Sequence, residues 1–324
     1  MRASHHATIL QACGHPNRDP FEEPRVNAIV KPSISQAVAN APHRCVALET
    51  TLLAHGVPRA DAPALADRLS AAVADAAATP AAIGVLEGVP TIGMSGEELA
   101  RMLATPDVAK CNTANLGVLI HRRATAATTV STTAELAALA GIRVFATGAI
   151  GGVHRGLADR LDISSDLAAL ARFPVAVVSS GVKGLLDVLS TREALESLGV
   201  PVVGYQTSTF PAFYVRASAA DVDARFDDPA ELADYAAWEL ARTGRGVLIC
   251  NPAPESHAFT QAEFEEMLAE AERTASGASG RDVTPQILGS LHTQSGGRTL
   301  ACNIALAESN AKLAGRLASA MPGQ

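Results

Sequence analysis

Residues 144–166 read VFATGAIGGVHRGLADRLDISSD. An apolar, β-favouring run leads into a glycine-rich turn, where the backbone can approach a ligand without interference from Cβ atoms. The ionisable side chains in and after this turn include His154, Arg155, Asp159, Asp162 and Asp166. No Lys-Ser/Thr pair follows the last glycine and the spacing is not GxGxxG, so neither common nucleotide signature is present. The pattern predicts a strand that ends in a binding site; a surface loop with solvated charges is the alternative.

Outward from this stretch, short apolar runs alternate with helical patterns along the chain. The predicted strands are Cys45–Leu48, Ala82–Leu86, Ile142–Ala146, Val175–Ser179, Val202–Tyr205 and Val247–Cys250. Strands that alternate with helices indicate a mostly parallel sheet covered on both faces. The sequence therefore predicts a three-layer α/β/α fold with a mostly parallel central sheet and a helical C-terminal portion from about Asp228.

The helices between these strands show two start signals of the capping-box type. Ser95 precedes Glu98 by three residues, and Thr132 precedes Glu135 by the same spacing. Such pairs predict a helix N-terminus, because each side chain can bond to the other residue's backbone N–H. Residues 1–35 are polar without clear periodicity, so we expect a poorly ordered N-terminal tail followed by one α/β domain over residues 36–324.

Composition excludes several classes of protein. The net charge is −7, and there is no long basic run that would favour nucleic acid or an anionic membrane surface. No apolar stretch is long enough to span a bilayer, and the N-terminus lacks the apolar core of a secretory signal. The five dispersed cysteines form no CxxC pair. We therefore expect a cytoplasmic protein with reduced thiols and no zinc cluster.

Polar residues follow several predicted strands directly. Glu49 comes after Cys45–Leu48, and Lys183 comes just beyond Val175–Ser179. Asn251 and Glu255 follow the last predicted strand. In open α/β sheets, ligands bind beyond the carboxyl ends of the strands, so these side chains are predicted to converge on one pocket.

The chemistry of Lys183 and Glu49 follows from their predicted surroundings. A lysine amine in apolar surroundings or near another cation loses its proton more easily and can form an imine with an aldehyde. A lysine that reaches out to solvent is the alternative. A carboxyl group at a strand end in an apolar context can serve as a general acid or base. A salt-bridge partner, or a carboxylate at a helix N-terminus, is the alternative for Glu49.

Asp162 and Asp166 form a second candidate pair. If a helix begins over residues 163–166, their spacing places both carboxylates on one face, where they would suit Mg²⁺ or Mn²⁺. In the alternative, Ser164 or Ser165 caps the helix and Asp166 stabilises its first turn.

Candidate phosphate donors lie in two further places. His154 and Arg155 could bind a phosphate or a planar polar group. Lys110 and the hydroxyls near a predicted helix N-terminus could add donors, with ordinary helix capping as the alternative. These hydroxyls belong to Thr128, Thr129 and Thr132.

Taken together, these segments resemble the pseudouridine 5′-phosphate glycosidase family. The resemblance runs from about Ser35 to the C-terminus, and its most specific part is GGVHRG followed by DISSD. The matching stretches include VALETTLLAHGVPR (46–59), GIRVFATGAIGGVHRG (141–156), DISSDLAALA (162–171), GVKGLLD (181–187), GVPVVGYQTSTFPAFYVR (199–216) and SGGRTLACNIALAESNAKLA (295–314).

The resemblance implies an α/β enzyme, forming homotrimers, that cleaves or forms the C–C bond between ribose 5-phosphate and uracil. The imine-forming lysine of the family falls on Lys183 and its acid/base glutamate on Glu49. One Mn²⁺ per subunit is expected at Asp162. Substrate contacts are expected at Lys110, Thr129, Val130, Ser164 and Asp166, with His154 and Asn303 near the base or the open sugar.

Three segments depart from the usual pattern of the family. Its Ser-Arg-Arg-Asp segment is replaced within CNTAN (111–115), its Ala-Gly-Ala-Lys within SSGVK (179–183), and its Gly-Gly-Ile by GAI (148–150). A changed pocket wall opens an alternative, in which the enzyme is a C-glycosynthase that joins ribose 5-phosphate to another carbon nucleophile. A non-catalytic sugar-phosphate sensor is a third hypothesis, disfavoured because Glu49, Asp162 and Lys183 occur together.

Overall fold

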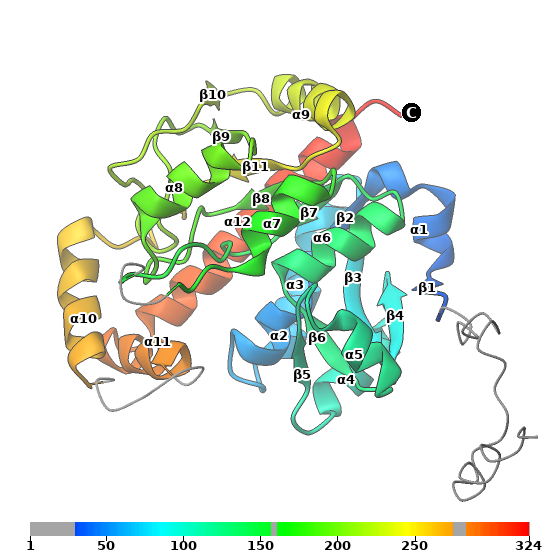
Figure 1. Ribbon diagram of the computed structural model, residues 1–324, viewed down its shortest axis with the longest axis horizontal. Coiled ribbons are helices and arrows are strands. Elements are labelled where there is room, and N and C mark those ends of the chain that lie inside the picture. The colour runs from blue at the N-terminus through cyan, green and yellow to red at the C-terminus, as the bar shows by residue number, and fades with distance from the viewer. Residues whose placement is uncertain (1–29, 157–160, 275–282, 324) are drawn as a thin grey trace, which may run out of the picture.

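The computed structural model describes residues 30–156, 161–274 and 283–323 (Figure 1). Asp159 and Cys13 lie outside these residues, as does most of the predicted tail. Ser33 and Ile34, which the prediction assigned to the tail, form a two-residue strand that pairs with the strand Val89–Ile92.

Within the described residues, eleven strands form one sheet in the order β1-β4-β3-β2-β7-β8-β11-β9-β10, with β6 pairing β3 and β5. Every pairing is parallel except those of β3 with β4 and with β6. The strands are β1 (Ser33–Ile34), β2 (Cys45–Glu49), β3 (Thr79–Leu86), β4 (Val89–Ile92), β5 (Ala109–Cys111), β6 (Ala126–Thr128), β7 (Val144–Ala146), β8 (Ala176–Ser179), β9 (Val202–Tyr205), β10 (Ala224–Phe226) and β11 (Val247–Cys250).

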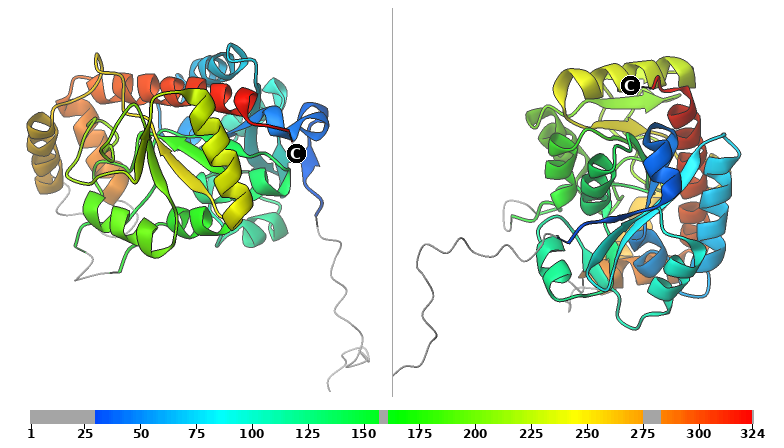
Figure 2. Two further views of the ribbon diagram at one scale, coloured as in Figure 1. Left: turned by 90° about the horizontal axis from the view of Figure 1, so that it is seen from above. Right: turned by 90° about the vertical axis from the view of Figure 1, so that its right-hand side faces the viewer.

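Helices cover both faces of this sheet. The helices α6 and α7 pack together on one face, while α3 and α12 pack together on the other, as Figures 1 and 2 show. The helices are α1 (Gln36–Asn40), α2 (Thr51–His55), α3 (Ala62–Ala74), α4 (Gly96–Ala104), α5 (Leu116–His121), α6 (Val130–Leu139), α7 (Ser165–Arg172), α8 (Val188–Ser197), α9 (Pro229–Thr243), α10 (Gln261–Thr274), α11 (Val283–Gln294) and α12 (Arg298–Ala320), with a 3-10 turn at Pro42–Arg44. The predicted three-layer α/β/α fold with a helical C-terminal portion is confirmed.

The six predicted strands are all present, and those at 202–205 and 247–250 have the predicted bounds. Central strands such as β8 and β11 are buried at every residue, which is why they appear in the sequence as continuous apolar runs. The strands that the prediction omitted have two to four residues each, too few to show a period of two.

One of the two predicted capping boxes is confirmed. The Ser95 side chain accepts a hydrogen bond from the backbone of Glu98, whose carboxylate accepts one from the backbone of Ser95. The other prediction is wrong, because α6 begins at Val130 with Thr129 at the N-cap. The end of β6 fixes that start, so Thr132 lies inside the helix and is fully buried.

The helix α12 crosses one face of the sheet and contacts β2, β7 and β8 (Figure 2). Asn303 and Asn310 lie seven residues apart on it, which places both on the same face of the helix. Both are buried in the protein. The four cysteines among the described residues are free and buried. No helix in the described ranges combines the length and apolarity that crossing a bilayer requires.

Candidate active site

Glu49 is the last residue of β2 and is partly buried. The hydroxyl of Thr147, the first residue after β7, donates a hydrogen bond to Glu49 Oε1. Burial raises the pKa of Glu49, while the Lys183 ammonium and the Thr147 hydroxyl act in the opposite direction. Asp166 adds to the rise and Lys110 opposes it. In the described part of the chain Glu49 makes no ion pair, so its predicted alternative as a salt-bridge partner is not observed.

Lys183 lies in the turn between β8 and α8. Its backbone N–H donates to the Ile150 carbonyl at 3.1 Å, which ties the turn to the glycine-rich loop after β7. Gly181 has a φ of +75°, and a Cβ there would lie 1.8 Å from the Pro211 carbonyl oxygen. This close approach requires glycine and fixes the path of the chain to Lys183. Among the described residues, no carboxylate pairs with the Lys183 ammonium.

Lys110 on β5 belongs to the same group of charges. Burial of its ammonium and the positive charge of Lys183 lower its pKa, while Glu49 and Asp166 act to raise it. Two cations and two carboxylates from four separate elements therefore influence one another. The structure thus brings together Glu49, Lys110, Asp166 and Lys183, as the strand-end rule predicts for Glu49 and Lys183.

Asp166 is buried, with 4% of its surface exposed, and ties three segments together. Its carboxylate accepts hydrogen bonds from the backbone N–H of Ser131 at 3.0 Å and of Gly151 at 2.8 Å. Ser164 caps α7 by accepting from the Asp166 backbone N–H, as in the capping alternative. Because α7 begins at Ser165, Asp162 lies before the helix, and the expectation of a shared helix face for Asp162 and Asp166 is wrong.

The threonines near the start of α6 divide into two kinds. Thr128 and Thr132 are fully buried, and the Thr128 hydroxyl donates to the Ile83 carbonyl at 2.7 Å. Neither can reach a phosphate, so that part of the prediction is wrong. Thr129 is only partly buried, and its hydroxyl lies 3.0 Å from the Ser131 hydroxyl. Val130 is buried in the first turn of the helix.

Asn303 lies at the glycine-rich loop. Its Oδ1 is buried and has no hydrogen-bond partner among the described residues, and a Cβ on Gly148 would lie 3.4 Å from that oxygen. Its Nδ2 donates to the Gly56 carbonyl at 3.3 Å. A buried, unsatisfied acceptor at this loop is suited to a ligand N–H or O–H group.

The remaining predicted residues are placed as follows. His154 is partly buried, and its backbone N–H donates to the Asp162 carbonyl at 3.0 Å. Arg155 is exposed beside it. Asn251 is buried and bonds to α12, and Glu255 is exposed, so the predicted convergence of these two on the pocket is not observed.

Sequence reasoning missed Thr147, Ser131 and Asn310. Thr147 directly follows the predicted strand 142–146, so the same strand-end rule that found Glu49 could have found it. Ser131 and Asn310 are polar residues in the interior of helices and carried no such signal.

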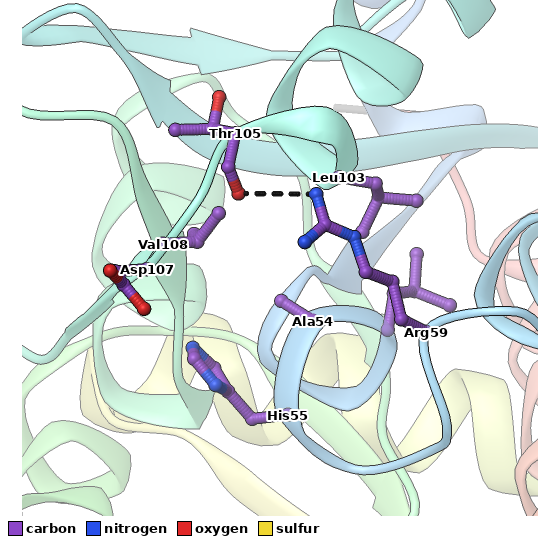
Figure 3. Close-up of a pocket in the computed structure, with 8 residues that line it drawn as sticks. Ala54, His55, Arg59, Leu103, Thr105, Asp107 and Val108 are labelled. Atoms are coloured by element: carbon purple, nitrogen blue, oxygen red, sulfur yellow. Dashed lines mark hydrogen bonds between the residues drawn. The ribbon is translucent and has the colours of Figure 1, made fainter.

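A small pocket lies between α2, the C-terminal end of α4 and the segment before β5 (Figure 3). His55 and Asp107 are on its rim, and the Arg59 guanidinium donates to the Thr105 carbonyl at 3.4 Å. None of the predicted site residues lines it. Burial and the Lys110 ammonium lower the pKa of His55, so this pocket adjoins the Lys110 side of the charged group.

The described residues contain no group of three or more His, Cys, Asp or Glu side chains that could hold a metal ion. Asp162, partly buried and unpaired within the described ranges, offers one carboxylate ligand. A single carboxylate fits Mn²⁺ or Mg²⁺ only as a site completed mainly by water or by substrate oxygens.

The sequence of this chain is similar to a known protein family and to named proteins over most of its length. The family model described as Indigoidine synthase A like protein matches residues 33–320. A protein from Hahella chejuensis named pseudouridine-5′-phosphate glycosidase is 43% identical over 295 residues, covering 90% of this chain and 97% of that one. A protein of the same name from Nocardioides sp. is 42% identical, covering 86% of this chain and 92% of its own.

Two solved structures are similar to this protein over about nine-tenths of the chain. The crystal structure of an indigoidine synthase A-like protein from Thermotoga maritima has a TM-score of 0.81 at 36% identity, covering 89% of this chain and 96% of that chain. The prealnumycin C-glycosynthase AlnA, solved in complex with ribulose 5-phosphate, has a TM-score of 0.83 at 34% identity, covering 90% of this chain and 97% of its own.

Proposed function

The chain belongs to the indigoidine synthase A-like family, and we propose that it is an enzyme that cleaves and forms the C–C glycosidic bond of pseudouridine 5′-phosphate. The products of cleavage are uracil and ribose 5-phosphate. The observation that carries the proposal is the group formed by Glu49 and Lys183, an acid with a raised pKa beside an amine that lacks an ion pair in the described residues. The names of relatives that are at least 42% identical support the choice of substrate.

The bond in question explains why an amine is needed. A C–C glycosidic bond has no leaving heteroatom to protonate, so simple hydrolysis through an oxocarbenium ion is difficult. When the sugar ring opens at O4′, the Lys183 amine bonds to C1′. After the attacking nitrogen has given one proton to the Glu49 carboxylate, its lone pair forms the C=N bond of an iminium as the C1′–C5 bond breaks. The electron pair of that bond goes to C5 of uracil, which takes up a proton, and water finally releases the aldehyde from Lys183.

Glu49 supplies the proton for ring opening. Its raised pKa keeps a proton on the carboxyl group at a pH where an ordinary glutamate is ionised. After transfer, the carboxylate is stabilised by the Thr147 hydroxyl and by the Lys110 ammonium. Lys110 is suited to the sugar phosphate, since its ammonium has no carboxylate partner in the described residues.

The imine is tested by trapping with borohydride. The chain has four lysines, Lys31, Lys110, Lys183 and Lys312, so a modified peptide identifies the site without ambiguity. Incubation with ribose 5-phosphate and borohydride should add the mass of the reduced sugar phosphate at Lys183. Lys183→Ala should abolish the adduct and turnover, whereas Lys312→Ala, at an exposed position of α12, should preserve both. An adduct elsewhere, or none, would contradict the mechanism.

The second candidate function is a C-glycosynthase that joins ribose 5-phosphate to another carbon nucleophile. The similarity to AlnA and the altered segment 111–115 favour it. In that segment Asn112 and Asn115 bond to each other's backbone and hold the Lys110 carbonyl, where the family usually carries arginines. The two functions separate in one assay. Release of uracil from pseudouridine 5′-phosphate supports the first, and trapping at Lys183 without such release supports the second.

The metal and the assembly belong to the same proposal. We infer one Mn²⁺ per subunit held by Asp162, where it would supply positive charge for a sugar hydroxyl or phosphate. Chelation should then lower activity, and Asp162→Asn should raise the Mn²⁺ concentration for half-maximal activity about tenfold or more, while Glu255→Gln should not.

A homotrimer is supported by the resemblance and by exposed Leu161 and Ile163 beside the glycine-rich loop. Light scattering would test for three times the mass of one chain.

The location proposed is cytoplasmic. It is supported by the free, buried state of the four described cysteines, which is typical of a reducing compartment. Fractionation of cells that express the tagged chain would test it.

A further inference from the structure

The side chain of Asn310 lies fully buried in α12 at the point where the ends of three strands meet. Its Nδ2 donates to the carbonyls of Thr147 at 2.8 Å and Gly148 at 3.3 Å, and lies 3.2 Å from the Ser180 hydroxyl. Its Oδ1 accepts from Asn251 Nδ2 at 2.9 Å. Burying an amide costs free energy that an apolar residue would not, so a fully bonded asparagine here points to a role beyond packing.

Two of these hydrogen bonds are made to the loop after β7, whose Thr147 hydroxyl bonds to Glu49. Thr147 and Gly148 directly follow β7, and the Thr147 backbone N–H donates to the Val178 carbonyl at 3.0 Å. With its N–H held by β8 and its carbonyl held by Asn310, the Thr147 backbone is fixed on both sides. That fixed backbone directs its hydroxyl onto Glu49 Oε1.

The contact between Asn310 Nδ2 and the Ser180 hydroxyl is made to the turn after β8 that contains Lys183. The Ser180 backbone N–H donates to the Gly148 carbonyl at 2.9 Å, so both loops meet at the atoms that Asn310 binds. Three residues further along, the Lys183 backbone N–H donates to the Ile150 carbonyl. One amide therefore bridges the loops that position the acid and the amine.

We propose that Asn310 is a positioning residue that holds the Thr147 hydroxyl on Glu49 and keeps the Lys183 turn in register with that carboxyl group. The proposal rests on the proposed function insofar as it takes Glu49 to be the acid of the reaction. Besides Thr147, the groups that face Glu49 are Lys183 from the turn after β8, Lys110 from β5 and Asp166 from α7.

Loss of the amide has a defined electrostatic consequence. Without Asn310 the Thr147 carbonyl loses its donor and the loop can relax, which weakens the hydrogen bond to Glu49. Because that bond favours the charged carboxylate, its loss moves the titration of Glu49 to higher pH. A hydrogen bond to a charged group supports a shift of about one pH unit.

The test compares Asn310→Leu and Thr147→Val with the wild-type enzyme by the pH profile of kcat on pseudouridine 5′-phosphate. Both variants should move the inflection of Glu49 upward, and the double variant should move it no further than either single one. The variant Thr147→Ser keeps the hydroxyl, so its pH profile should have the same inflection as that of the wild type. Ser309→Ala removes a neighbouring hydrogen bond to Asn251 and should leave the inflection unchanged. Asn310→Ala serves if the leucine variant does not fold.

A second readout is independent of turnover. The difference in Tm between wild type and each variant should grow as pH rises, because the variant carboxyl group resists ionisation more strongly. In the Glu49→Gln background that dependence on pH should vanish. Uniform loss of kcat with an unmoved inflection, or a pH dependence of the Tm difference that persists in the Glu49→Gln background, would overturn the proposal. Absence of turnover with the expected pH-dependent Tm would contradict the function and leave Asn310 in its positioning role.

Discussion

The carboxylate of Asp166 accepts the backbone N–H of Gly151 at 2.8 Å, which joins the first turn of α7 to the glycine-rich loop. The same carboxylate accepts the backbone N–H of Ser131, so one side chain holds three segments around the site. A Cβ at Gly151 would lie 2.9 Å from Asp166 Oδ2 and 2.3 Å from the Ser164 hydroxyl, which explains the glycine. The geometry of this loop therefore depends on a buried carboxylate as much as on its glycines.

Asp166→Ala should destabilise the fold by about 3 kcal/mol, because it leaves two backbone donors buried without an acceptor. Denaturation by urea would measure the change. Ser164→Ala is the matched control, since it removes only the N-cap of the same helix and should cost about 1 kcal/mol. Equal effects of the two substitutions would contradict the joining role of Asp166.

Gly181→Ala should abolish borohydride trapping at Lys183 and destabilise the protein. The new Cβ would lie 1.8 Å from the Pro211 carbonyl oxygen at a φ of +75°, so the turn must move. Peptide mapping and thermal unfolding would follow the two effects. Gly117→Ala is the control, because the residue is in α5 and, beyond its chain neighbours and its own helix backbone, no heavy atom of the described residues lies within 4 Å of a Cβ there. It should be neutral or stabilise by up to about 1 kcal/mol. Normal trapping by Gly181→Ala would show that the turn is not constrained.

Glu49→Gln should stabilise the folded protein increasingly as pH rises, while kcat falls at least a hundredfold. Burial raises the pKa of Glu49 in the folded state, so the folded protein favours the protonated carboxyl group. Wild type therefore loses stability between the unfolded-state pKa of about 4.3 and the raised folded value, and glutamine does not. Tm measured across pH should show a gain of roughly 3 °C or more for the variant near neutrality. A gain independent of pH would contradict a raised pKa.

Lys110→Met should raise the pKa of His55, because the Lys110 ammonium helps to lower it. The His55 ring resonances in an NMR titration, assigned with His55→Gln, would show the change. The same substitution should raise KM for the phosphorylated substrate about tenfold or more through loss of a charge-assisted contact. Lys312→Met removes an exposed lysine and should change neither quantity. An unchanged His55 pKa would place Lys110 away from this pocket.

The fold was predictable from sequence wherever a strand is a continuous apolar run in the core. β8, β9 and β11 are continuous apolar runs, and their ends were found within one residue. β5 and β6 have three residues each, including Lys110 and Thr128, and their pairing depends on contacts between distant segments. The false capping box at Thr132 arose because the end of β6, not local chemistry, fixes the start of α6.

The site was predictable to the extent that it depends on strand ends. Glu49 and Lys183 each follow an apolar strand, and the structure places them in one group of charges. Thr147 follows a strand too, but a lone threonine gave no reason to assign it a partner. The role of Asn310 could not be predicted from the sequence, because it depends on four contacts with residues 59 to 163 positions away.

The path of α12 also has a consequence for the order in which the enzyme is made. Every strand of the described chain precedes α12 in the sequence, and the loops after β7 and β8 need Asn310 to complete their bonding. A nascent chain on the ribosome can thus form its sheet before its catalytic groups are aligned. We therefore expect activity only after this helix docks, since until then the Thr147 and Gly148 carbonyls lack the side-chain donor that Asn310 provides.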